Sequence, residues 1–264
     1  MSTALFKLYE SPGFVLGADG LKQKIEDDGA ITTETFSCQK IFPIRQPDKA
    51  LAYSLTGTVQ LGGETSEGAG FDFAARTRDA VEAMANRNAS DLKAYVTEVC
   101  ASLEGLLNEA KKNGRVESYP AAEVQWEGET GDTIVEILFD GYYRGTPSSV
   151  RARFFHDNQV FAPPEIVDEP NVEGGMRIDG SANIANGLFK TDEPLFDIYR
   201  KSWTSDSPLL LAIQKAKSYF RACADPEVRK LDERACARIG GRTHIATISP
   251  QRGFQWVEGF EPKE

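Results

Sequence analysis

Short apolar runs bounded by turn residues recur along the chain and predict its strands. Several runs are rich in β-branched and aromatic residues, and Gly, Pro, Asn or Asp separate neighbouring runs. The turn Glu10-Ser11-Pro12-Gly13 predicts a hairpin, whereas residues 161–175, which contain three prolines and several acidic residues, predict an exposed loop. The predicted strands are residues 4–9, 14–18, 38–44, 50–56, 133–143, 149–156, 243–249 and 253–257.

Apolar residues spaced three or four apart predict two helical regions between these strands. The first begins at Asp72, continues after an expected N-cap at Ser90 and ends at residues 111–114, where two lysines precede Asn and Gly. The second region comprises residues 181–203, which Gly187 and Pro194 interrupt, and residues 209–220. The order of strands, helices, strands, helices and strands suits an α+β fold, a four-layer α/β/β/α sandwich.

Length and composition limit the organisation of the chain and its partners. With 264 residues and 41% hydrophobic content, we expect a single domain over residues 1–264. The formal net charge of −10 would repel a phosphate backbone, so nucleic acid is not an expected partner. No apolar stretch approaches the length of a membrane-spanning helix and the N-terminus lacks a signal-peptide pattern, so we expect no membrane partner and a cytoplasmic location.

The cysteines and histidines give no sign of a metal or cofactor site. The four cysteines show no CxxC pair and are expected to be reduced thiols. The two histidines, His156 and His244, lie too far apart for a local zinc motif and do not form a persuasive Ser-His-Asp triad. His244 is interpreted as a structural histidine of the strand at residues 243–249. No cofactor or metal is expected.

Three sequence runs together carry a resemblance to a known family. The chain resembles the proteasome-like N-terminal-nucleophile (Ntn) hydrolases, the superfamily of 20S proteasome subunits and bacterial proteasome-type proteins. The resemblance implies the four-layer sandwich named above and cleavage of a peptide or amide bond. The runs that carry it are Phe14-Val15-Leu16-Gly17-Ala18-Asp19, Gln39-Lys40-Ile41-Phe42-Pro43-Ile44 and Gly240-Gly241-Arg242-Thr243-His244-Ile245-Ala246-Thr247-Ile248-Ser249-Pro250.

In this family the N-terminal Thr, Ser or Cys attacks the carbonyl, and its own α-amine accepts the hydroxyl proton. An α-amine with a pKa of about 7.7 to 8 is partly unprotonated near neutral pH, so a histidine is unnecessary. An ungapped count from Asp19 implies Thr3 as the nucleophile, and one extra residue in the first turn implies Ser2. Lys7 implies a third register with Met1 at that position and no nucleophile.

The resemblance implies roles for further residues. Asp19 matches the carboxylate that orients the site, Lys40 the cation beside the nucleophile, and Gly57 the backbone N–H that faces the oxyanion. Ser181 matches the auxiliary hydroxyl with a shift of one residue. The alternative interpretation from the residues alone is that Asp19 caps a strand end and that Lys40 is a solvated lysine of an edge strand.

Two supporting residues of the family pattern, an Asp and a Ser, are replaced by Cys236 and Ile239, and Asp225 or Asp232 is a candidate substitute.

Three functions therefore stay open. The first is a threonine- or serine-type peptidase acting on a peptide or amide substrate. The second is an inactive subunit that serves assembly or binding. The third is a small-molecule amidase whose insertions at 158–180 and 225–238 reshape the site. The family also implies a homo-oligomeric ring or stacked ring and an unfoldase partner.

Overall fold

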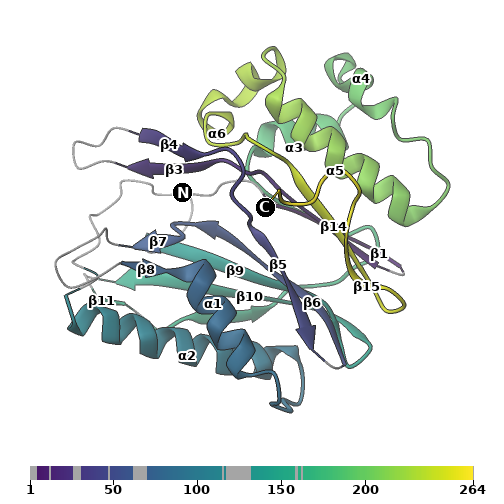
Figure 1. Ribbon diagram of the computed structural model, residues 1–264. Helices are drawn as coiled ribbons and strands as arrows, with labels where there is room; N and C mark the ends of the chain where they lie inside the picture. Colours follow the sequence, from purple (N-terminus) through teal and green to yellow (C-terminus); the bar gives the residue numbers. More distant parts are fainter. Residues whose placement is uncertain are drawn as a thin grey trace.

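The computed structural model describes residues 5–11, 13–25, 31–46, 48–61, 70–114, 116, 132–157, 160–161 and 163–263 (Figure 1). Its strands are β1 (Leu5–Glu10), β2 (Gly13–Ala18), β3 (Lys22–Ile25), β4 (Ile31–Thr35), β5 (Ile41–Gln46), β6 (Lys49–Gly57), β7 (Gln60–Leu61), β8 (Phe71–Asp72), β9 (Asp132–Tyr143), β10 (Thr146–Asp157), β11 (Val160–Phe161), β12 (Glu165–Asp168), β13 (Met176–Asp179), β14 (His244–Ser249) and β15 (Gly253–Trp256). The α-helices are α1 (Phe73–Ala83), α2 (Leu92–Lys112), α3 (Ala182–Phe189), α4 (Asp197–Arg200), α5 (Pro208–Ala224) and α6 (Glu233–Cys236). Two short 3₁₀ helices are η1 (Pro194–Phe196) and η2 (Val228–Asp232).

Two antiparallel sheets dominate the structure. One has the strand order β13-β1-β2-β14-β15, and the other β11-β10-β9-β6-β5 with β12 also paired to β10. The first and last strands of the chain therefore meet in one sheet, where β14 pairs with β2. This pairing brings the run around Asp19 beside the run around His244, although more than two hundred residues separate them in the sequence.

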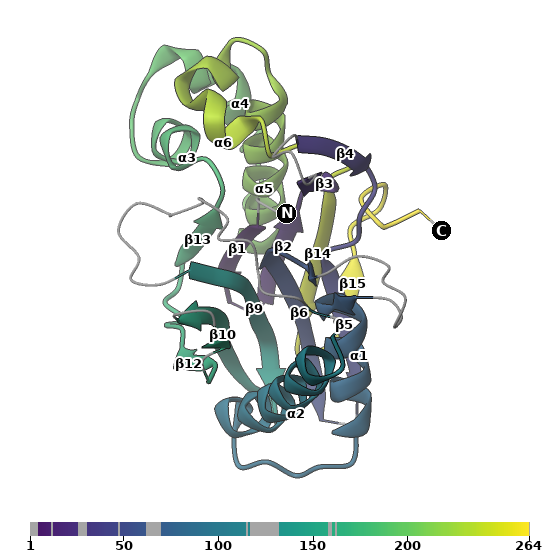
Figure 2. The same cartoon turned by 90° about the vertical axis from the view of Figure 1, so that its left-hand side faces the viewer.

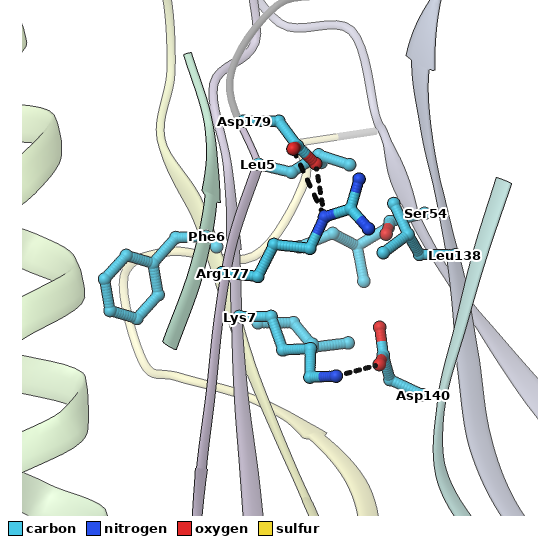
Figure 3. A pocket seen from close by; sticks show the side chains of 11 residues that line it. Leu5, Phe6, Lys7, Ser54, Leu138, Asp140, Arg177 and Asp179 are labelled. Carbon is cyan, nitrogen blue, oxygen red and sulfur yellow. Dashed lines mark hydrogen bonds and ion pairs between the residues drawn. The ribbon is translucent and has the colours of Figure 1, made fainter. Parts of the chain in front are cut away.

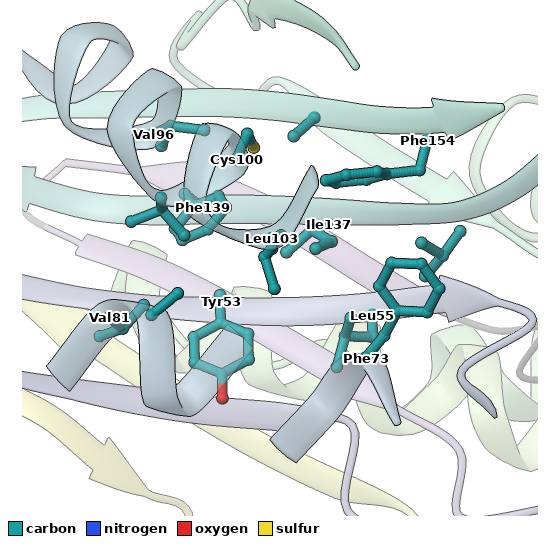
Figure 4. Close-up of a cluster of buried hydrophobic side chains, with 14 of the residues drawn as sticks. Tyr53, Leu55, Phe73, Val81, Val96, Cys100, Leu103, Ile137, Phe139 and Phe154 are labelled. Carbon is teal, nitrogen blue, oxygen red and sulfur yellow. The ribbon is translucent and has the colours of Figure 1, made fainter. Parts of the chain in front are cut away.

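Helices cover the outer faces of the two sheets, and Figure 2 shows them on opposite sides of the molecule. Helices α1 and α2 share a buried cluster with the six-stranded sheet, in which Leu103 packs near Phe139 and Phe154 (Figure 4). Helices α3 and α5 share a second cluster with the five-stranded sheet, which includes Phe6 and Tyr219. The mixed α and β character expected from the sequence is confirmed.

A third buried cluster contains side chains from both sheets. Its members come from β1, β2 and β14 in one sheet and from β5, β6 and β9 in the other, and they are Leu5, Phe14, Leu16, Ala18, Ile41, Ala52, Leu138, Tyr142, Ala246 and Ile248. Side chains alternate across a strand, so the residues next to these point to the opposite face of each sheet, where the helices pack.

Three predicted details differ from the structure. The N-cap of α2 is Asp91 and not Ser90, because the Asp91 carboxylate accepts the Ala94 N–H at 2.8 Å. The sequence predicts Gly145-Thr146-Pro147 as the turn before β10, but the turn is Arg144-Gly145, whose φ angles of 50° and 79° suit a tight two-residue hairpin. The expected loop at residues 161–175 contains β12, which pairs with β10.

Two elements that position the site gave no recognisable sequence signal. The hairpin of β3 and β4 is mostly polar, and its β4 strand is exposed. Strand β13 has only four residues, two of them charged, and it forms because β1 offers an open edge with which it can pair. Within the described residues no helix is long and apolar enough to span a membrane.

Candidate functional site

A buried ion pair lies where β2 ends and β5 begins. Asp19 directly follows β2, Lys40 directly precedes β5, and the Lys40 Nζ donates to Asp19 Oδ1 at 2.6 Å. Each residue is only 1% exposed. A charge removed from water to this extent is costly unless it is paired, so the two residues depend on each other. The interpretation of Lys40 as a solvated edge lysine is wrong.

The second oxygen of Asp19 holds the surrounding backbone. Asp19 Oδ2 accepts the N–H groups of Leu21 and Gly240, each at 3.2 Å. The bond to Leu21, two residues on, is the local turn contact expected of an Asp at a strand end. Asp19 is therefore both a turn residue and the partner of Lys40, and it ties β2 to the segment before β14.

Two glycines let three segments approach one another beside this ion pair. Gly20 N–H donates to Gly240 O at 3.0 Å, and Arg242 N–H donates to Phe36 O at 2.6 Å. A Cβ on Gly20 would lie 2.6 Å from the Arg242 carbonyl oxygen and 2.7 Å from that of Phe36. Gly241 has φ +70 and also lies against Phe36. The glycines next to the family-like runs thus permit the close packing that encloses Asp19.

His244, the first residue of β14, lies one strand away from Asp19. It pairs with Ala18, the residue before Asp19, and is fully buried. Neither Nδ1 nor Nε2 of its ring has a hydrogen-bond partner among the described residues. Burial, together with the charges of Arg242 and Lys40, lowers the pKa of His244 to about 4. The imidazole is therefore neutral near pH 7, and the strand pattern gave no sign of its unpaired nitrogens.

Ser181 is buried at the N-terminus of α3. Its Oγ accepts the Ile184 N–H at 3.2 Å as an N-cap and donates to Asp232 Oδ2 at 2.7 Å. Its backbone N–H donates to the Tyr219 hydroxyl at 3.0 Å. Of the two substitutes considered from the sequence, Asp232 contacts Ser181, whereas Asp225 accepts a bond from the Tyr199 hydroxyl at 2.7 Å.

Cys236 and Ile239, which stand where the resemblance implies an Asp and a Ser, are both buried. Ile239 packs in the cluster between the five-stranded sheet and its helices. Cys236 interacts with Ser181 and with the thiol of Cys223, and the Cys236 contact and burial raise the Cys223 pKa. Cys223 and Cys236 are free thiols, as expected of reduced cysteines.

Gly57 is the last residue of β6, and another residue of this strand hydrogen-bonds to the backbone of Lys40. The Lys40 carbonyl accepts the Leu55 N–H at 3.1 Å, two residues before Gly57. Gly57 has φ +94, and a Cβ there would lie 2.6 Å from the Ile134 carbonyl oxygen, so only glycine fits. Ser2 and Thr3 lie outside the described residues.

A small pocket lies between the sheets where β1 begins (Figure 3). Leu5, the first described residue of β1, lines it and pairs with Ala18 on one side and Asp179 on the other. Ile41, which follows Lys40, lines it as well. The pocket therefore adjoins the Asp19–Lys40 pair at the start of β1.

Charged side chains in and beside the pocket are satisfied by one another. Lys7 Nζ donates to Ser149 Oγ at 2.7 Å and lies 3.4 Å from Asp140. Arg177 bonds to Asp179 at 3.2 Å and to Glu136 of the facing sheet at 2.8 Å. These pairs fasten β1 and β13 to the six-stranded sheet.

Comparisons with known proteins leave the function to be inferred from this chain's own residues. No family model matches the sequence, and no curated protein matches it. Among solved structures, Anbu (ancestral beta-subunit) from Yersinia bercovieri aligns with 98% of this chain and 88% of its own, with 12% sequence identity and a TM-score of 0.48. A backbone similarity of this size carries no conclusion about chemistry.

Proposed function

We propose that this protein is an Ntn hydrolase that cleaves a peptide or amide bond, built on a four-layer α/β/β/α sandwich. The observation that carries the proposal is the buried Asp19–Lys40 pair beside the start of β1. The two runs that suggested these residues from the sequence converge there, together with the run at residues 240–250. The three buried clusters described above support the order of layers.

The candidate nucleophiles are within reach of this pair by covalent geometry alone. Leu5 pairs with Ala18, the neighbour of Asp19. Two peptide units separate Thr3 from Leu5 and three separate Ser2, which limits the Cα distances to about 7.6 and 11.4 Å. Leu5 and Lys7 line the pocket between the sheets at the start of β1. Both residues remain candidates, and removal of Met1 alone would expose Ser2.

The proposed reaction follows from these positions. The hydroxyl oxygen of Thr3 or Ser2 attacks the carbonyl carbon, and the α-amine of the same residue accepts the hydroxyl proton. Lys40 stabilises negative charge on the nucleophile, and the Gly57 N–H stabilises the oxyanion. The amine leaving group takes the proton as the C–N bond breaks, and water then hydrolyses the ester. Asp19 positions Lys40, and Asp232 accepts a hydrogen bond from Ser181, the candidate auxiliary hydroxyl.

Intact-protein mass spectrometry with N-terminal sequencing tests the proposal. The probe is a peptidyl epoxyketone, which reacts with a hydroxyl and a free α-amine on one residue. We expect the mature chain to begin at Ser2 or Thr3 and to carry one stoichiometric adduct there. An unprocessed Met1 and no adduct would contradict the proposal.

Three variants identify the nucleophile and the role of the ion pair. If Ser2 is the nucleophile, Ser2→Ala should abolish the adduct and Thr3→Ala should leave it unchanged. If Thr3 is the nucleophile, the two results should be reversed. Asp19→Asn keeps an oxygen for the Leu21 and Gly240 N–H groups but removes the charge that pairs with Lys40, so adduct formation should slow at least tenfold in a folded protein. Circular dichroism of each variant controls for unfolding.

A catalytically inactive subunit that serves assembly is the second candidate. It is favoured by Ile239, which supplies no polar group where the family has one, and by exposed apolar residues on the outer helices. Leu195, Ile198 and Leu210 are exposed there. Mass photometry would show a ring of several copies that Leu210→Glu dissociates, while Asp19→Asn leaves its mass unchanged. An unfoldase partner belongs to either proposal only if such a ring forms.

A further inference from the structure

The layer between the two sheets changes in character toward the edge formed by β13. At its centre the sheets share the apolar cluster that contains Phe14 and Leu138. At the β13 edge the contact between the sheets is ionic, because Arg177 of β13 donates to Glu136 of β9 at 2.8 Å. The spacing of the sheets at this edge therefore depends on directed, charge-assisted hydrogen bonds.

Four side chains here form a closed ion-pair ring in which positive and negative charges alternate. Arg177 Nη2 lies 2.8 Å from Glu136 Oε1, and Arg151 Nη1 lies 3.3 Å from Glu136 Oε2. Glu169 Oε1 closes the ring, since it lies 2.8 Å from Arg151 Nε and 3.0 Å from Arg177 Nη1. Arg151 belongs to β10, and Glu169 follows β12, which pairs with β10. Arg177 is therefore the member that joins the ring to the five-stranded sheet.

The ring depends on the shape of a guanidinium at position 177. Arg177 donates through Nε to Asp179, through Nη1 to Glu169 and through Nη2 to Glu136. These N–H groups diverge in one plane, so each carboxylate is held in a fixed direction. The four ring side chains are 11–23% exposed, so salt and water screen their contacts less than those of surface pairs.

Strand β13 connects the ring to the start of β1. The two strands pair, with Arg177 opposite Lys7 and Asp179 opposite Leu5. Leu5 is the first described residue of β1, and the candidate nucleophiles precede it in the sequence. Figure 3 shows the Arg177 side chain directed across the pocket toward Ser54 of the facing sheet.

On the other side, the ring reaches the candidate oxyanion donor. Glu136 of β9 pairs with Thr56 of β6, and Gly57 is the next residue of β6. The bond from Arg177 to Glu136 therefore links the strand beside β1 to the strand beside Gly57. The ring joins the two sheets on the path between the start of β1 and Gly57.

We propose that Arg177 is a positioning residue that holds the start of β1 at a fixed distance from Gly57 across the two sheets. The role rests on the proposed function, because it requires that the N-terminal residue attacks a carbonyl whose oxyanion faces the Gly57 N–H. A displacement of about 1 Å in such an arrangement can cost about a hundredfold in rate. Arg177 itself touches neither the substrate nor the reacting atoms.

The kinetics of adduct formation with the peptidyl epoxyketone test the positioning role. In Arg177→Gln the maximal rate should fall at least tenfold, while the probe concentration that gives half of that rate stays within twofold of the wild type. The matched control is Arg153→Gln, since Arg153 lies 3.5 Å from Glu136 and 3.6 Å from Glu165, both on the side of the six-stranded sheet. An unchanged maximal rate in Arg177→Gln, or an equal loss in Arg153→Gln, would overturn the proposal.

Thiol labelling tests the spacing of the sheets without any nucleophile. Ser54→Cys introduces a thiol into the pocket lining, in a Cys38→Ser background whose remaining cysteines are buried. N-ethylmaleimide should label this thiol at least tenfold faster when Arg177→Gln is added, and no faster when Arg153→Gln is added. Cys100, which is buried against the six-stranded sheet, should stay unlabelled and controls for global unfolding.

Equal labelling rates with and without Arg177→Gln would overturn the proposal. If the wild type forms no epoxyketone adduct, the proposed function fails, and the labelling rates still decide whether Arg177 sets the spacing of the sheets.

Discussion

At the scale of single residues, the site is dominated by charges and dipoles that water does not reach. Lys40 Nζ lies 2.6 Å from Asp19 Oδ1, and Asp19 Oδ2 accepts two backbone N–H groups. His244, one strand away, is not matched in this way. A buried pair contributes little net stability when intact, but removal of one member leaves an uncompensated charge. These two situations predict opposite responses to substitution.

Lys40→Met should destabilise the protein by about 3–5 kcal/mol, because the Asp19 carboxylate loses its cation in a site closed to water. The double variant Asp19→Asn/Lys40→Met should recover most of that loss. Urea unfolding of the two single variants and the double variant measures the coupling. The control is Lys230→Met, since the Lys230–Glu227 pair at 2.7 Å is exposed and should contribute less than about 0.5 kcal/mol. Equal effects at the two lysines would contradict the prediction.

The depressed pKa of His244 predicts how stability depends on pH. Its pKa falls from 6.5 to about 4 on folding, so between these values the unfolded chain binds a proton that the folded chain excludes. The stability that this group contributes is fully present above pH 6.5 and is lost as pH falls toward 4. By linkage, the loss amounts to about 3 kcal/mol.

Urea unfolding between pH 4 and 7 measures this dependence. The pH dependence of the wild type, after subtraction of that of His244→Phe, should show the loss between pH 6.5 and 4. The subtraction removes the contribution of carboxylates common to both proteins. Parallel curves for the two proteins would contradict the assignment.

At the scale of elements, the site is assembled by close backbone contacts between segments without regular pairing. Residues 20, 36–38 and 240–242 lie against one another, and Cys38 N–H donates to Gly20 O at 2.8 Å. The approach leaves no room for a side chain at Gly20 or Gly241. The glycines therefore determine how β2 and β14 present Asp19 and His244.

Gly241→Ala should cost more stability than Gly145→Ala. Both glycines have positive φ, +70 and +79, so each substitution adds about 1–2 kcal/mol of backbone strain. A Cβ at Gly241 would also collide with the Phe36 carbonyl, whereas one at Gly145 meets nothing within 4 Å. Thermal unfolding of both variants isolates the effect of packing. Equal losses of stability would show that the backbone near Gly241 moves away from the new Cβ at no cost.

At the scale of the whole molecule, the layer between the sheets joins the two halves. Phe14 of β2 is fully buried and packs edge-on to Tyr142 of β9, with ring centroids 5.6 Å apart. Arg177 and Lys7 add ionic contacts from one sheet to the other. Shared contacts of this kind make separate unfolding of the two sheets unfavourable. This is the physical reason to expect a single domain.

Urea unfolding should therefore show one transition. Far-UV circular dichroism reports all helices. In a Trp126→Phe background, tryptophan fluorescence reports Trp203 and Trp256, which lie with the five-stranded sheet and its helices, so coincident midpoints are expected. Phe14→Ala should lower the free energy of unfolding by about 3–5 kcal/mol and shift both signals equally. Two separated transitions would contradict a single domain.

Local sequence patterns were enough to predict the helices and strands in which buried residues recur at regular intervals. Strands such as β2 and β14, and helix α2 with its terminal lysines and Asn113, follow from apolar periodicity and end signals that act within a few residues. Asp19 and Lys40 became candidates in another way, through the family resemblance of the runs that contain them. Short polar strands such as β13 have no comparable signal, since the energy of their hydrogen bonds depends on a neighbouring strand.

Only tertiary structure decided which candidates meet. It brought Asp19 to Lys40 and Asp232 to Ser181, and it left the nitrogens of His244 without a hydrogen-bond partner in the described part of the chain. The physical reason is that the burial of a polar group depends on what lies opposite it in space. A strand sequence encodes which face a side chain takes, but the partner on that face comes from another segment of the chain, 21 residues away for Asp19 and Lys40 and 51 for Ser181 and Asp232.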